Sequence, residues 1–317
     1  MTRTTRYAVV GAGALGSYYG ARLSHAGCDV HFLLRSDYDH ARRHGMRIVS
    51  NLYGDFSLAA PQVYPNPVDM PRCDVALIAL KTTANAALPD ILPQVLTRSG
   101  FALVMQNGLG IEPDVAKIVG DDRVMGGLAF LCCNKVGPAD VLHVDYGDVR
   151  LGEHSAEERP RGITGRMLAV AADFRSAGIH VDLDEDLLLA RWKKLVWNIP
   201  YNGLAVTHDT TTDRLMADPQ TRAHCETLMR EVVAGAASQG RVIPDAYVGQ
   251  MLDYTDNMKP YLPSMKLDHD ASRPMELEAI YGNPLRAAAS AGVTLPHIQS
   301  LYGELKRLDS RRRTDTP

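Results

Sequence analysis

The strongest constraint on the fold is a glycine-rich loop near the start of the chain, within RYAVVGAGALGSYYGARLSHAG. Residues 7–10 are typical of a short buried strand, and residues 14–24 have the apolar spacing of a helix. The glycines between them permit a tight turn, a close approach of the backbone to a pyrophosphate, and close packing of helix on strand. A purely structural glycine turn is the alternative. We therefore expect a dinucleotide-binding loop formed by Gly11, Ala12, Gly13, Ala14, Leu15 and Gly16.

The residue after the second expected strand (residues 29–35) indicates which dinucleotide binds. An NAD site usually has an acidic side chain there for the ribose 2′-hydroxyl, whereas this chain has Arg35 followed by Ser36. An arginine favours the 2′-phosphate of NADP(H) through charge-assisted hydrogen bonds. Asp37 lies only two residues further on, so NAD(H) stays open, as does an exposed Arg35 without a cofactor role. NADP(H) is the expected cofactor.

Two more candidate cofactor residues lie where expected strands end. Lys81 ends the strand of residues 73–81, and Asn107 ends the strand of residues 101–108. Ligands of open α/β sheets bind at the carboxyl ends of the strands. Lys81 could instead end its strand in solvent, and Asn107-Gly108 could be a plain turn.

Alternating strands and helices predict an α/β fold: a Rossmann-like, doubly wound parallel sheet. Besides the strands already named, residues 46–50 and 178–186 are expected to be extended. A Pro-rich loop is expected at residues 61–71, and a helix at residues 85–96. Beyond residue 184 only helical patterns follow, so residues 1–183 are the expected NADP(H)-binding domain and residues 184–317 an all-helical substrate and dimerisation domain. The expected helices there are 186–199, 219–239, 244–256 and 274–291, and the charged tail 311–317 is expected to fray.

Composition excludes several classes of function. The net charge of −3 gives no overall electrostatic attraction to nucleic acid or to an anionic membrane. No run of apolar residues approaches the length that crosses a bilayer. Five cysteines without a CxxC pair favour a reduced, cytoplasmic protein.

His40 and His44 have a spacing that two metal ligands use, but Arg42 and Arg43 between them disfavour a cation, so no metal is expected. Ser17 lacks the GxSxG context of a hydrolase.

The segment RWKKLVWNIPYN, residues 191–202, carries a polar stripe on an otherwise apolar helix. Lys194, Asn198 and Asn202 are spaced four apart, which places them on one helical face. Pro200 should kink or end the helix, so Asn202 belongs to that face only if the kink is mild. Asparagine is a poor helix former, so its repetition argues against a merely solvated face.

The chain resembles the ketopantoate reductase (2-dehydropantoate 2-reductase) family, whose members reduce a 2-oxo acid with NADPH. The resemblance spans nearly the whole length and depends on the order of its motifs. These are GAGALG at 11–16, LLRS at 33–36, ALKT at 79–82, QNG at 106–108, WKKLVWNIPYN at 192–202, PSM at 263–265 and the glutamate at 276.

The resemblance implies a role for each matching residue. Arg35 and Lys81 would contact the 2′-phosphate end of the cofactor, and Asn107 would lie near the nicotinamide ribose. Lys194 matches the catalytic lysine, and Glu276 the acidic partner in the active site. The substrate-binding residues would be Asn198, Asn202 and Ser264.

One position departs from the family pattern. Thr212 lies where members with established ketopantoate activity often have another asparagine. This departure bears on the identity of the substrate and not on the reaction class. The resemblance implies reduction of 2-dehydropantoate to pantoate in pantothenate biosynthesis. The alternatives are reduction of another 2-oxo acid by a member of the same family, or a non-catalytic NADP(H)-binding regulator. A small-molecule substrate is expected, with no nucleic acid or membrane partner, and a homodimer is the candidate assembly.

Overall fold

The computed structural model describes residues 4–314, with side chains described up to residue 310. Contacts between Cα atoms divide the chain into two compact units. Unit 1 consists of Met1–Gln106 and Ile111–Leu187, and unit 2 of Asn107–Gly110 and Leu188–Pro317. The short segment Asn107–Gly110 thus belongs to the helical unit, although it lies far before the expected domain boundary at 183/184.

Unit 1 contains a ten-stranded sheet with the order β4-β3-β9-β8-β7-β6-β1-β2-β5, and β10 pairs with β9. The strands β1, β2, β6 and β7 pair in parallel, so that Val10, Leu33, Ile78 and Val104 end them side by side. The strands are β1 (Arg6–Val10), β2 (Asp29–Leu33), β3 (Met46–Ser50), β4 (Phe56–Leu58), β5 (Gln62–Tyr64), β6 (Cys73–Ile78), β7 (Leu96–Val104), β8 (Val124–Gly137), β9 (Asp140–Glu153) and β10 (Val181–Leu183).

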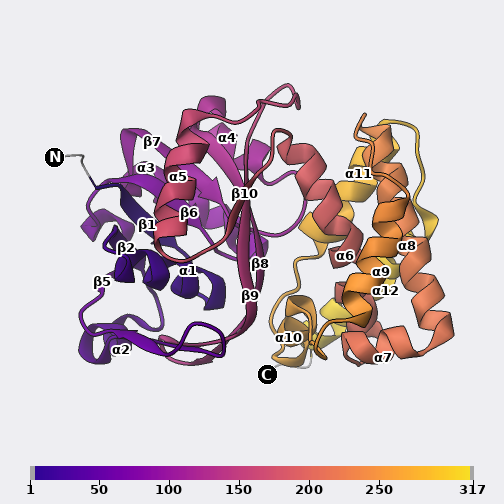
Figure 1. Ribbon diagram of the computed structural model, residues 1–317, viewed down its shortest axis with the longest axis horizontal. Helices are drawn as coiled ribbons and strands as arrows, with labels where there is room; N and C mark the ends of the chain where they lie inside the picture. The colour runs from indigo at the N-terminus through magenta and orange to yellow at the C-terminus, as the bar shows by residue number, and fades with distance from the viewer. Residues whose placement is uncertain (1–3, 315–317) are drawn as a thin grey trace. The chain divides into compact units, whose positions relative to one another are not determined.

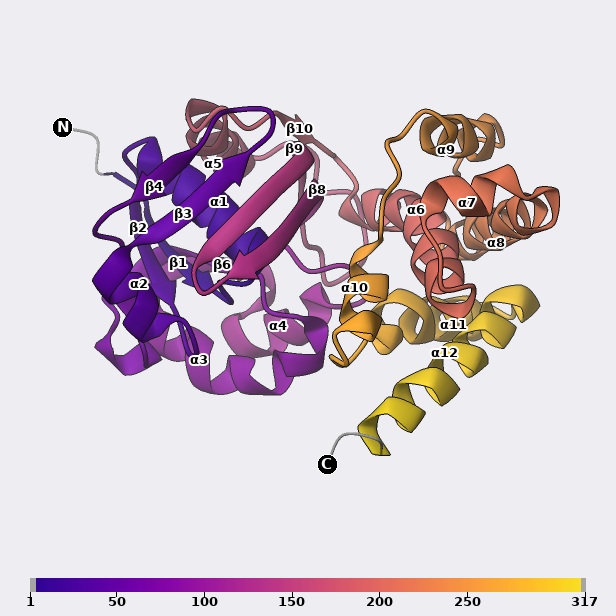
Figure 2. The same ribbon diagram turned by 90° about the horizontal axis from the view of Figure 1, so that it is seen from below.

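Helices cover both faces of this sheet, which confirms the doubly wound α/β fold (Figures 1 and 2). One face carries α1 (Ala14–His25) and α5 (Gly165–Ser176), which contact each other. The other face carries α3 (Leu88–Val95) and α4 (Glu112–Val119). The apolar run of β1 is buried because helices lie on both of its sides, as expected for a central parallel strand.

The sheet is mixed rather than purely parallel, which corrects the sequence-based expectation. Strands β8 and β9 form a long antiparallel hairpin, and β3 pairs antiparallel with β4. Figure 2 shows the hairpin running toward the short helix α2 (Tyr38–His44). No element was expected from the sequence within residues 109–177, which contain this hairpin.

Two other expectations for unit 1 need correction. The Pro-rich stretch 61–71 contains strand β5 and a 3₁₀ turn (Pro67–Asp69), because its prolines flank an edge strand instead of interrupting it. The expected helix 85–96 is divided between a 3₁₀ segment (Thr82–Ala87) and α3, and Leu96 already begins β7.

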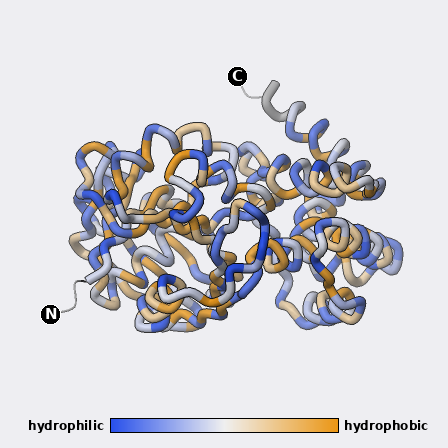
Figure 3. The backbone as a smooth tube through the Cα atoms, turned by 90° about the horizontal axis from the view of Figure 1, so that it is seen from above, coloured by the Kyte–Doolittle hydropathy of each residue, from blue (hydrophilic) through white to orange (hydrophobic). Residues whose placement is uncertain are grey.

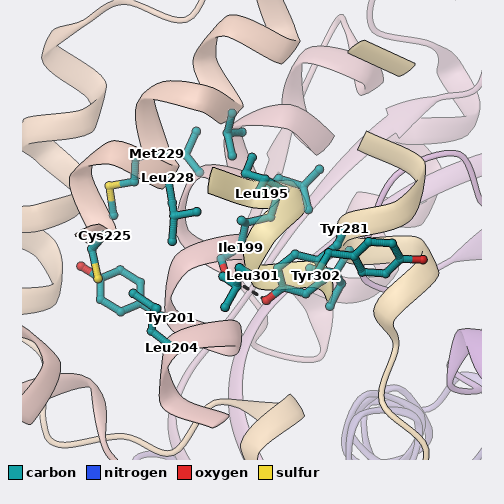
Figure 4. Close-up of a cluster of buried hydrophobic side chains, with 14 of the residues drawn as sticks. Leu195, Ile199, Tyr201, Leu204, Cys225, Leu228, Met229, Tyr281, Leu301 and Tyr302 are labelled. Carbon is teal, nitrogen blue, oxygen red and sulfur yellow. Dashed lines mark hydrogen bonds between the residues drawn. The ribbon is translucent and has the colours of Figure 1, made fainter. Parts of the chain in front are cut away.

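Unit 2 is helical, as expected, and its core surrounds one long helix. The apolar residues of α6 (Leu187–Thr207) pack against residues 219–238 and 296–314; Figure 4 shows Leu195 and Ile199 among them. The other helices are α7 (Thr212–Ala217), α8 (Pro219–Ser238), α9 (Ala246–Asp256), α10 (Ser264–Asp270), the π-helix η4 (Glu278–Gly282), α11 (Asn283–Ser290) and α12 (Pro296–Thr314).

Helix α6 runs through Pro200 for two more turns, so the proline does not end it. Proline removes one backbone N–H, which costs a single intrahelical hydrogen bond. Beside it, the hydroxyl of Tyr281 donates a hydrogen bond to the carbonyl of Ile199 at 2.9 Å (Figure 4). The expected tail 311–317 is helical in its first part, because α12 continues through Thr314; residues 315–317 lie outside the described residues. Before residue 311, the later turns of α12 are mostly hydrophilic (Figure 3).

Candidate active site

The glycine loop of unit 1 connects β1 to α1, with the geometry expected for a dinucleotide loop. Gly11 has a φ of +98°, and a Cβ there would lie 2.4 Å from the backbone N of Leu80. A Cβ at Gly16 would lie 2.2 Å from the carbonyl oxygen of Gly11. Gly13 is exposed, and a Cβ there would meet nothing within 4 Å. Two glycines are therefore required by the fold, while the third leaves open space at the N-terminus of α1, which fits a pyrophosphate.

This difference between Gly11 and Gly13 predicts that alanine at Gly11 destabilises the fold, whereas alanine at Gly13 mainly affects nucleotide binding. Gly11→Ala should lower the free energy of unfolding by at least about 2 kcal/mol, because both its φ and its backbone neighbours exclude a side chain. Gly13→Ala should change the free energy of unfolding by less than about 0.5 kcal/mol yet weaken nucleotide binding. Urea unfolding combined with titration of NADPH fluorescence checks both. Equal stability losses in the two variants would contradict this account of the loop.

The end of β2 presents Arg35 and Ser36 to solvent but not Asp37. The Asp37 carboxylate is 6 % exposed and accepts hydrogen bonds from the backbone N–H of Ala139 at 3.0 Å and from the Ser36 hydroxyl at 3.0 Å. Lys135 forms an ion pair with it. Burial raises the pKa of Asp37, but the bonds from Lys135 and Ala139 outweigh burial and hold it below its usual value. Asp37, the acidic residue that left NAD(H) as an alternative cofactor, is thus bound to the β8–β9 hairpin.

Lys81 is exposed and lies just beyond β6, at the carboxyl edge of the parallel strands. Gln106 is buried beside it, and its amide N donates to the carbonyl of Leu80 at 2.8 Å and to Oδ1 of Asn85 at 2.6 Å. Gln106 therefore fixes the segment that carries Lys81. Gln106 belongs to the QNG motif, but the motif alone did not predict this role.

Asn107 begins the segment that is built into unit 2. The N–H of Leu109 donates to the carbonyl of Ala279 at 2.9 Å, and Asn283 donates to the carbonyl of Leu109 at 2.6 Å. Gly108 has a φ of +109°, and a Cβ there would lie 2.4 Å from the same Ala279 oxygen. The π-helix η4 thus sets the position of Asn107.

Lys194 and Asn198 lie one turn apart on the same face of α6. Asn198 is 6 % exposed, and Lys194 is partly buried. Burial and the charge of Arg191 lower the pKa of Lys194 to about 7, while Glu276 acts in the opposite direction. Arg191 is 2 % exposed and lies one turn before Lys194; it is a site residue that was not predicted from the sequence. A lysine tuned in this way can exchange a proton near neutral pH.

Glu276 is 4 % exposed and lies two residues before η4. π-helical turns are rare and occur frequently at functional sites. Its negative charge acts on Lys194 on α6, so the structure brings together the two residues that the resemblance made catalytic partners.

Asn202 continues the polar stripe of α6, but its side-chain oxygen already accepts a hydrogen bond. It is 3 % exposed, and its Oδ1 accepts a hydrogen bond from the backbone N–H of Met265 at 3.1 Å. This bond holds the start of α10, where Ser264 is the first residue. Thr212 is buried too, exchanging hydrogen bonds with the backbone of Tyr261 at 3.1 and 3.3 Å. Both side chains thus position the segment 261–265.

Comparison with known proteins agrees with this geometry. The model of the family "Ketopantoate reductase PanE/ApbA" matches residues 7–156, and that of its C-terminal part matches residues 186–309. The chain is 53 % identical to a 2-dehydropantoate 2-reductase from a Nostoc species, covering 98 % of this chain and 97 % of that one. The chain belongs to the ketopantoate reductase family. It is thus an oxidoreductase of a family that acts on CH–OH groups and uses NADPH.

Solved ketopantoate reductases have the same fold. The 2-dehydropantoate 2-reductase from Geobacter metallireducens superposes with a TM-score of 0.91 at 41 % identity, covering 95 % of this chain and 99 % of that one. The enzyme from Methylococcus capsulatus superposes with a TM-score of 0.87 at 33 % identity, covering 97 % of both chains. Within residues 4–314 no helix is long and apolar enough to cross a membrane. The same residues contain no cluster of three side chains suited to hold a metal ion.

Proposed function

We propose that this protein reduces 2-dehydropantoate to pantoate with NADPH, in pantothenate biosynthesis. The observation that carries the proposal is the placement of Lys194 and the buried Asn198 on one face of α6, with the charge of Glu276 acting on Lys194, in a chain of the ketopantoate reductase family. A non-catalytic regulator would have no need of such a proton donor.

The proposed chemistry follows from the charge that develops on the substrate. NADPH, when bound, supplies a hydride to the ketone carbon, and negative charge then builds on the carbonyl oxygen. The Lys194 ammonium stabilises that charge and donates its proton to the oxygen. Glu276 keeps part of the lysine population protonated at neutral pH, because its negative charge favours the ammonium form.

We assign substrate binding to Asn198, Asn202 and Ser264. Asn198 shares the helical face of Lys194 and adds hydrogen-bonding capacity without charge. Asn202 has its oxygen on Met265, so its amide nitrogen is the part assigned to the substrate, and Ser264 is held beside it. Amide and hydroxyl donors suit the carboxylate and hydroxyl groups of a small 2-oxo acid.

We assign cofactor binding to the glycine loop, residues 11–16, with Arg35 and Lys81 on the 2′-phosphate and Asn107 near the nicotinamide ribose. Gly13 offers the open side of the loop, and the exposed guanidinium of Arg35 fits a phosphate. Residues 1–183 form the proposed NADP(H)-binding domain, and residues 184–317 the proposed substrate domain.

The test is NADPH oxidation, followed by its near-ultraviolet absorbance, with a panel of 2-oxo acids. Turnover restricted to 2-dehydropantoate supports the proposal. Preference for a branched or aromatic 2-oxo acid favours the second candidate, a reductase of another substrate; Thr212, bound to the Tyr261 backbone, is the observation that keeps it open. Tight NADPH binding without turnover of any acid would contradict a catalytic role.

The proton-donor role predicts a defined pH dependence. With the pKa of Lys194 at about 7, kcat/KM should be flat below that pH and fall about tenfold per unit above it, since only the ammonium donates. Arg191→Met removes a positive neighbour and should raise the pKa, so the fall should begin at higher pH. Rate profiles of both proteins check this. A profile that rises with pH would exclude Lys194 as the acid.

We further propose a homodimer in the cytoplasm. A dimeric ketopantoate reductase from Staphylococcus aureus has the same fold, with a TM-score of 0.81 at 19 % identity, covering 97 % of this chain and 99 % of that one. All five cysteines are free thiols, which suits a reducing compartment. The molar mass from light scattering tests the dimer.

A further inference from the structure

The segment after β2 carries the side chains by which a dinucleotide site distinguishes NAD(H) from NADP(H). In this chain one of these side chains is a carboxylate. In NAD sites an acidic side chain after this strand binds the ribose 2′-hydroxyl, whereas NADP sites place a cation there. This chain has both, with Arg35 exposed and Asp37 buried two residues later. The two side chains have opposite effects on a 2′-phosphate, so what happens to the Asp37 charge bears directly on cofactor choice.

The β8–β9 hairpin binds Asp37 from about one hundred residues away in sequence. Lys135, near the end of β8, pairs with one carboxylate oxygen, and the backbone N–H of Ala139 donates to the same oxygen at 3.0 Å. Ala139 lies in the hairpin turn with a φ of +57°, and its carbonyl accepts from Arg47 of β3 at 3.1 Å. The turn is thus fixed to the sheet, and rotating Asp37 away would leave a buried N–H without a partner.

We propose that Lys135 determines cofactor specificity by pairing with Asp37, which withholds that carboxylate from the ribose and cancels its charge beside Arg35. The inference rests on the proposed NADP(H) function and adds a residue outside the nucleotide loop. Lys135 is a positioning residue, because it acts through Asp37. Its side chain is 38 % exposed, so its removal opens no core cavity.

The experiment measures binding of adenosine 2′,5′-bisphosphate and of 5′-AMP to the full-length protein by calorimetry. Lys135→Met should weaken the bisphosphate about tenfold, the order of magnitude expected for one uncompensated carboxylate close to a doubly charged phosphate in water. Binding of 5′-AMP should change less than about twofold, because it lacks that phosphate. Lys135→Arg should restore the wild-type ratio.

A double-mutant cycle and a control separate this role from a structural one. The double variant Asp37→Asn/Lys135→Met should return to the wild-type ratio, because both charges of the pair are then absent and no uncompensated carboxylate remains. Lys117→Met is the matched control; Lys117 pairs with Asp114 on α4, which follows β7, three strands from β2. It should leave both affinities unchanged.

The outcomes distinguish the inference from the function on which it rests. Wild-type protein that binds neither nucleotide, or binds both equally, would overturn the proposed NADP(H) function and the inference with it. Wild-type protein that prefers the bisphosphate, with the same preference in Lys135→Met, would overturn the inference alone. Parallel weakening of both nucleotides together with a lower melting temperature would assign Lys135 a purely structural role, and so would also overturn it.

Discussion

Lys194→Met is expected to lower kcat by at least about 100-fold, the low end of the effect of losing a general acid. The methionine keeps the length of the side chain but can neither donate a proton nor stabilise the charge on the carbonyl oxygen. Steady-state rates with NADPH and 2-dehydropantoate measure the effect, and the dissociation constant of NADPH should stay within about threefold of wild type. Near-wild-type turnover would contradict the assignment.

The chain offers matched controls for this substitution. Lys193 is the adjacent lysine on α6, partly buried, with its ammonium 5.8 Å from the ring centre of Tyr247. Lys193→Met removes the same charge from another helical face and should leave kcat within about twofold. Lys194→Arg keeps a positive charge, but a guanidinium stays protonated at every accessible pH, so it should stabilise the developing charge without donating a proton efficiently. A rate between those of wild type and Lys194→Met is expected.

Arg35→Ala is expected to weaken NADPH binding about 10- to 100-fold, the range for losing a hydrogen bond to a charged group. NADH binding should weaken by less than about threefold, because NADH has no 2′-phosphate. Fluorescence titration of both cofactors gives the two constants. Equal losses would place Arg35 away from the 2′-phosphate.

Arg47→Ala is the control for Arg35. Arg47 is an exposed arginine of β3 whose nearest acidic partner is Asp55 at 3.7 Å, a surface pair that contributes little stability. If the general positive charge of unit 1, rather than Arg35 itself, favours NADPH, both substitutions should lower the NADPH affinity alike. We expect only Arg35→Ala to do so.

Local pattern predicted the parallel half of the fold because each element there is specified by nearby residues. The apolar run before Gly11 and the helical spacing after it needed no distant partner. The β8–β9 hairpin was different. Its turn requires a left-handed backbone at Ala139, a conformation that alanine rarely adopts and that its sequence does not signal. The turn is instead held by β3, whose Arg47 pairs with Asp140 and donates its backbone N–H to the carbonyl of Ala139.

The candidate site shows the same limit. The four-residue spacing was sufficient to place Lys194 and Asn198 on one face of α6. The spacing could not predict whether Pro200 ends the helix, because that depends on how the flanking turns pack. Nor could it decide between Arg35 and Asp37, because the groups that bind Asp37 lie on a hairpin about one hundred residues later.

The central claim is that the Lys194 ammonium protonates the carbonyl oxygen of a 2-oxo acid. A crystal structure of the protein with NADP⁺ and pantoate tests it most directly. The account predicts Nζ of Lys194 within hydrogen-bond distance, about 2.7–3.2 Å, of the hydroxyl oxygen on C2 of pantoate. A Lys194 side chain directed into solvent, with another group on that oxygen, would contradict it.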